Sequence, residues 1–159
     1  MYQYRVTKYN PKFRSATGSY MVDDWTSRSD IGKTFGGTLL TEERYLSIEQ
    51  AYLQAASALL AEANIVQLKV VGLENRGGMS NVPPEGSLIP SSRVPQVLRS
   101  LLREEYWCKL EGSKSFIHVG YDYYMYVGLP AKCLNAVAAA KNLDLFVEVF
   151  PSPYTGIYD

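Results

Sequence analysis

Apolar and polar positions recur along this chain with two different periods, which predict a mixture of strands and helices. The longest strand-type stretch is 116–127, where every odd position carries an apolar or aromatic side chain. Because successive side chains of a strand point to opposite faces, this stretch predicts a central strand with one face in the core. Four shorter stretches also predict strands, at 2–9, 65–73, 106–110 and 143–150.

Three stretches have the helical period instead. Thr41 is a suitable N-cap for the first, and the two acids that follow it favour the positive end of the helix dipole. A second cap signal, Ser47 with Gln50, leaves open that this helix consists of two pieces joined near Leu46. The predicted helices extend from 41 to about 64, from 92 to 105 and from 131 to 141.

Two long segments predict loops: 12–38, which is rich in glycine, serine, aspartate and threonine, and 75–90, which is interrupted by glycines and prolines. The elements therefore follow the order β-α-β-α-β-β-α-β. This order predicts an α+β fold in which three helices cover one face of a mostly antiparallel sheet. The length of 159 residues is typical of a single domain spanning 1–159, large enough to bury a core without disulfides or metal.

Composition narrows the possible partners and location. Sixteen basic and sixteen acidic residues give a net charge of zero, so bulk charge favours neither a nucleic acid nor a membrane as partner. Cys108 and Cys133 lie in apolar surroundings and match no metal-ligand or disulfide spacing, which favours a reducing compartment. The start of the chain lacks the apolar core of a secretion signal, and no stretch is long enough to span a membrane. We therefore expect a cytoplasmic protein with no cofactor.

The segment 27–34 ends like a phosphate-binding loop but lacks the features that make such a loop work. Ser27 stands where the motif needs glycine, and Asp30 would place a negative charge near the phosphate oxygens. No strand precedes the segment, and Gly36 with Gly37 interrupts the helix that should follow. We interpret the segment as an ordinary loop.

His118 is the only histidine, and Asp122 lies on the same face of the predicted strand. Four residues along a strand span about 13 Å, so the two side chains cannot hydrogen-bond unless the strand bulges at Gly120. Gly120 indicates either a small pocket or a place where another backbone or an aromatic ring packs closely. A buried structural histidine is therefore the preferred interpretation over a catalytic one, and we expect no enzyme.

Acidic and aromatic residues form the better candidate site. Rigid aromatic rings supply contact area in protein interfaces, and carboxylates attract basic groups of a partner. The alternative is that Trp25 belongs to the core and the acids are solvated caps and turns. The predicted partner-binding residues are Asp23, Asp24, Trp25, Asp30, Asp122, Tyr124, Tyr126 and Tyr154, with Tyr158 and Asp159 in the tail.

Three segments, 8–11, 25–33 and 120–126, resemble a family of small bacterial immunity proteins of contact-dependent inhibition and related polymorphic toxin systems. The resemblance implies a cytoplasmic inhibitor that binds a cognate toxin domain, often a nuclease, and blocks its active site. A small-molecule-binding protein or enzyme with a pocket around His118, Gly120 and Asp122 is the alternative. A structural or regulatory subunit, dimeric through a strand edge, is a third possibility.

Overall fold

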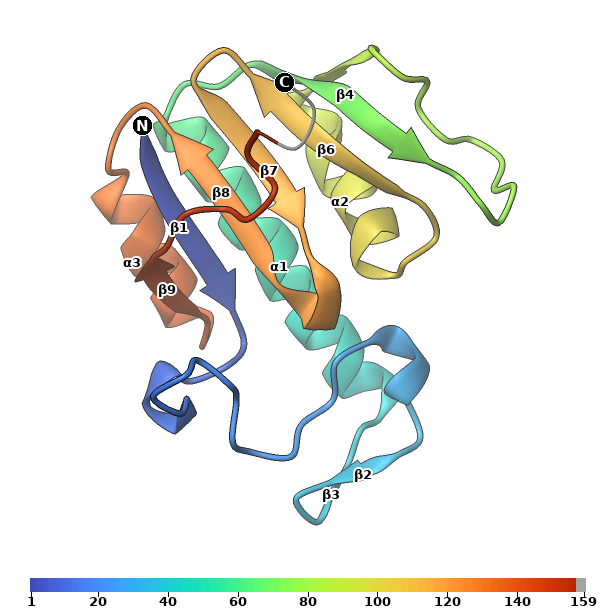
Figure 1. The fold of residues 1–159 in the computed structure, drawn as a ribbon, viewed down its shortest axis with the longest axis vertical. Coiled ribbons are helices and arrows are strands. Elements are labelled where there is room, and N and C mark those ends of the chain that lie inside the picture. The colour runs from blue at the N-terminus through green and yellow to red at the C-terminus, as the bar shows by residue number, and fades with distance from the viewer. Residues whose placement is uncertain (157–159) are drawn as a thin grey trace.

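The computed structural model describes residues 1–156 and arranges them as a sheet with three helices on one face (Figure 1). Within these residues, seven strands pair in the order β5-β4-β6-β7-β8-β1-β9, and every neighbouring pair is antiparallel. The α+β class predicted from the sequence is confirmed. The elements are β1 (Tyr2–Thr7), β2 (Thr34–Phe35), β3 (Thr38–Leu39), α1 (Glu42–Glu62), β4 (Gln67–Glu74), β5 (Leu88–Pro90), α2 (Val94–Leu102), β6 (Trp107–Gly112), β7 (Ser115–Val119), β8 (Met125–Leu129), α3 (Leu134–Asn142) and β9 (Phe146–Val149).

Helix α1 is the longest element and lies along the back of the sheet (Figure 1). The Thr41 hydroxyl accepts a hydrogen bond from the Arg44 amide at 3.2 Å, which satisfies one of the free amides at the helix start. The helix is continuous, so the possibility of two pieces joined near Leu46 is not realised. It ends before Asn64, whose φ of 56° is left-handed and incompatible with a continuing helix.

The core fills the space between the helices and the sheet. Its central strands contribute Ile117, Val119, Met125 and Val127, all at most 4% exposed. These are odd-numbered positions, as the alternation predicted, whereas Tyr121, another odd position of the stretch, is 83% exposed and the prediction is wrong there. None of the helices in residues 1–156 is long and apolar enough to cross a membrane.

The prediction of one continuous strand over 116–127 is wrong, because the chain reverses direction between β7 and β8. Asp122 and Tyr123 have left-handed φ values of 59° and 66°, and the Gly120 amide donates to the Tyr124 carbonyl at 2.8 Å. Side chains distant in sequence hold this turn: the Tyr9 hydroxyl donates to the Asp122 carbonyl, and the Tyr52 hydroxyl donates to the Tyr123 carbonyl. The reversal places His118 directly opposite Tyr126.

Both predicted loops contain short strands. Strands β2 and β3 form a small separate hairpin in the first loop, and β5 pairs with β4 in the second. The Glu85 carboxylate accepts hydrogen bonds from the Gly72 and Leu73 amides at 2.8 Å each, which fixes the second loop against β4.

The sheet face opposite the helices is crossed by residues 150–156, which we call the C-terminal strap (Figure 1). The Phe150 amide donates to the Gln3 carbonyl, and the Ser152 amide donates to the Gln3 side chain at 2.9 Å. Ser152 is only 4% exposed. The strap therefore covers polar side chains at the centre of this face, among them His118, which lies against the Ser152 hydroxyl.

Candidate functional site

Two residues predicted to bind a partner are buried, and for these the prediction of an exposed surface is wrong. Trp25 is 4% exposed and packs edge-on against Tyr45 and Tyr123, with ring centroids 5.5 and 4.9 Å away. Tyr126 is 6% exposed because the C-terminal strap covers it and Tyr154 packs against its ring. The alternative that Trp25 belongs to the core is therefore the correct one.

Two of the predicted acids have structural partners. Asp24 lies 2.9 Å from the Lys8 ammonium and also accepts a hydrogen bond from the Trp25 amide. Asp30 accepts from the Thr26 and Ser27 amides and pairs with Lys33. Burial opposes ionisation of Asp30, but these donors outweigh it and lower its pKa. Asp23 and Asp122 are exposed, while Tyr158 and Asp159 lie outside the described residues.

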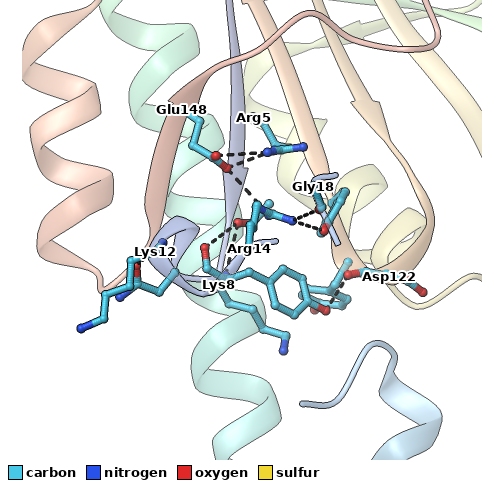
Figure 2. Close-up of polar contacts among 12 residues, drawn as sticks. Arg5, Lys8, Lys12, Arg14, Gly18, Asp122 and Glu148 are labelled. Carbon is cyan, nitrogen blue, oxygen red and sulfur yellow. Dashed lines mark hydrogen bonds and ion pairs between the residues drawn. The ribbon is translucent and has the colours of Figure 1, made fainter. Parts of the chain in front are cut away.

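Tyr124 is fixed by a cationic cluster on the sheet face, where Arg5 and Arg14 both reach Glu148 (Figure 2). Arg5 forms a bidentate pair with the Glu148 carboxylate at 3.0 Å, and its guanidinium lies 5.5 Å from the Tyr124 ring centroid. Arg14 donates to the Tyr124 hydroxyl at 2.6 Å. These contacts join β1, β9, the first loop and the turn before β8, so the half-buried Tyr124 has a structural partner already.

His118 has no free ring nitrogen. It is 1% exposed, with Nδ1 2.7 Å from the Ser152 hydroxyl and Nε2 3.0 Å from the Glu111 carboxylate. Burial lowers its pKa to about 4, against the opposing effect of Glu111, so the ring is neutral at pH 7. Asp122 lies in the exposed turn instead, and a pocket built on both residues is therefore not formed. The preferred interpretation of a structural histidine agrees with this geometry.

A hollow of about 540 Å³ does lie beside Gly120, but neither His118 nor Asp122 is among its lining residues. Its position is at the ends of β4, α2 and β7, next to the C-terminal strap. We call this site the aromatic hollow. Its lining residues are Glu74, Arg76, Gly77, Leu101, Glu104, Glu105, Tyr106, Trp107, Val119, Gly120, Tyr121 and Tyr154.

Gly120 determines how the strap closes one side of the aromatic hollow. A Cβ at this position would lie 2.9 Å from the Tyr154 hydroxyl and 3.3 Å from the Tyr126 ring. The missing side chain therefore lets Tyr154 lie across β7, which is one of the roles expected for Gly120. Trp107 forms a second wall, since its indole N–H donates to the Val119 carbonyl at 2.9 Å and its ring is 5.7 Å from that of Tyr154.

Charged residues surround the opening of the aromatic hollow. Glu74, Glu104 and Glu105 contribute three carboxylates against the single guanidinium of Arg76, which gives the lining a net charge of −2. Tyr121 is 83% exposed at the same opening. Carboxylates and aromatic faces both attract cations, so this arrangement is suited to a positively charged group.

Sequence reasoning identified Gly120 and Tyr154 but missed the rest of the lining. The glutamates come from β4 and from the connection between α2 and β6, which are separated by about thirty positions in the chain. No sequence motif marks them. Within residues 1–156, no group of three potential metal ligands lies together, and Cys108 and Cys133 are buried free thiols.

No protein-family model matches this sequence, and comparisons with curated proteins and with solved structures found no match.

Proposed function

We propose that this protein is an immunity protein, a cytoplasmic inhibitor that binds a cognate toxin domain and covers its active site. The observation that carries the proposal is the exposed Tyr121, 83% accessible, on a turn that is rigidly held and bordered by acidic residues. The carboxylates of Asp122, Glu104 and Glu105 supply negative charge around it. Tyrosine anchors surrounded by charge are typical of tight protein interfaces.

The turn supports this function because it presents Tyr121 at little entropic cost. Buried hydroxyls of Tyr9 and Tyr52 fix the two residues that follow it, so its backbone is ordered before a partner binds. Negative charge beside the anchor accelerates association with a basic partner. A nuclease has such a basic surface because it binds phosphates, so we propose a nuclease domain as the toxin.

The proposal predicts that the neighbouring gene encodes a large secreted protein with a variable C-terminal domain. Expressing that domain should stop growth, and co-expressing this chain should restore it. We expect Tyr121→Ala to weaken binding of the purified domain about tenfold or more. Asp122→Asn should slow association at low salt, and asparagine is tolerated at its left-handed φ of 59°.

Tyr2→Ala is the matched control, because Tyr2 is also an exposed tyrosine but lies on the opposite end of the sheet from the turn. This variant should bind as the wild type does. A toxin domain that still kills in the presence of this chain, or equal binding by Tyr121→Ala and Tyr2→Ala, would contradict the proposal.

A second function is favoured by the aromatic hollow itself. Its volume of about 540 Å³ lies within the range of small-molecule sites. The alternative of a small-molecule-binding protein therefore remains, centred on Trp107 and Tyr154 in place of His118 and Asp122. Neutralisation of the toxin domain separates the two, because a small-molecule-binding protein would not restore growth.

A further inference from the structure

The aromatic hollow has walls whose orientation does not depend on a ligand. The hydrogen bond from the Trp107 indole to the Val119 carbonyl fixes one ring. Tyr154 is fixed through its backbone, whose amide donates to the Ser152 hydroxyl at 3.2 Å and whose carbonyl accepts from Lys109 at 3.5 Å. A planar group that enters therefore meets rings that are already ordered, so little side-chain entropy is lost on binding.

The charge of the aromatic hollow selects for a cation. Glu104 and Glu105 have no basic partner on the hollow's lining other than Arg76, and Arg76 is paired with Glu74 at 3.6 Å. The Arg76 side chain is 90% exposed, so its guanidinium lies in solvent and not against the rings. The carboxylates of Glu104 and Glu105, beside ordered aromatic faces, are therefore available to bind a cationic group from another molecule.

We propose that the aromatic hollow binds the guanidinium group of an arginine side chain presented by a protein partner. The inference rests on the proposed function and names the chemical group on the toxin that this site binds. Guanidinium is planar and weakly hydrated, so it stacks on Trp107 or Tyr154 better than an ammonium does. Its fork of N–H donors can also reach the carboxylates of Glu104 and Glu105 together.

A capped arginine, N-acetyl-arginine N-methylamide, tests the site without a toxin. The reporter is the indole N–H signal of Trp107 in ¹H–¹⁵N NMR spectra, because Trp107 lines the hollow, and the buried Trp25 serves as an internal reference. We expect the capped arginine to shift the Trp107 signal in a saturable way. The citrulline analogue has the same shape without the charge and should leave it unchanged.

Charge variants give the second part of the test. Glu104→Gln and Glu105→Gln should each weaken binding of the capped arginine about threefold to tenfold, as expected for one lost charge partner. Arg76→Ala should tighten it, because a like charge at the opening is removed. Asp144→Asn is the matched control, since it removes one exposed carboxylate in the connection between α3 and β9.

Three results would overturn the inference. The first is a capped arginine that leaves Trp107 unchanged, and the second is an equal response to arginine and citrulline analogues. The third is free arginine binding at least tenfold more tightly than the capped form, which would identify a site for a small molecule. Failure of the proposed function is distinguishable from these, because arginine binding would then persist while the toxin domain remained active.

Discussion

The buried His118 predicts a specific loss of stability in mild acid. Its pKa is lowered to about 4 in the folded protein, mainly by burial, whereas an unfolded chain has a histidine pKa of about 6.5. The unfolded chain therefore takes up a proton first as the pH falls, and folding stability decreases through this window. Between about pH 7 and pH 4.5 the loss through this one group is about 2 kcal/mol.

The assay is urea unfolding at a series of pH values, for the wild type and for His118→Gln. Glutamine can donate to Glu111 and accept from Ser152 but does not titrate, so the carboxylates of the chain contribute equally to both proteins. The wild type should lose about 2 kcal/mol more than the variant over this range. Because the chain has a single histidine, its ring protons also give the pKa directly by NMR. Equal losses, or a measured pKa at or above 6.5, would refute the reasoning.

Three further predictions concern stability. Gly128→Ala should cost about 1–3 kcal/mol in urea unfolding, because its Cβ would lie 2.3 Å from the Phe116 ring, whereas Gly77→Ala, with open space around it, should be neutral. Glu49→Gln should cost about 2–3 kcal/mol, since the buried carboxylate forms a bidentate pair with Arg103 at 2.8 Å; an unchanged melting temperature would contradict this. Burial lowers the pKa of Lys8 to about 8 from 10.5, so the folded protein loses this proton before the unfolded chain does as the pH rises. From pH 8 to 10 the wild type should therefore gain about 2 kcal/mol of folding stability relative to Lys8→Met. Parallel pH profiles of the two proteins would argue against this.

Periodicity predicted the parts of this fold that local sequence determines. The stripe on α1 and the inward positions of β7 and β8 were identified because they repeat with the period of a helix or a strand. The turn at 120–124 was missed because distant side chains hold its left-handed residues, Asp122 and Tyr123. The hydroxyl of Tyr9, which follows β1, binds the first, and the hydroxyl of Tyr52 in α1 binds the second. Such contacts join segments far apart in the chain and leave no local pattern.

Only Gly120 and Tyr154 of the candidate site were predicted from the sequence. Gly120 indicated either a pocket or a closely packed backbone or ring, and the structure has a hollow beside it together with the closely packed ring of Tyr154. The acidic residues expected to form the partner surface divide between ion pairs and exposed turns, because a sequence does not show which cation lies near which carboxylate. Lys8 and Asp24, sixteen positions apart, are one example.

The position of β1 between β8 and β9 has a consequence for synthesis of the protein on the ribosome. Within the residues that the structure describes, β1 pairs with residues 125–129 and 146–149, which are translated long after it. Its neighbours on both sides are therefore missing while residues 8–124 are translated, and the Gln3 contacts of the strap form later still. Native pairing of β1 thus begins only after residue 125 has left the ribosome, so this strand stays unpaired in the sheet while the residues before β8 are made.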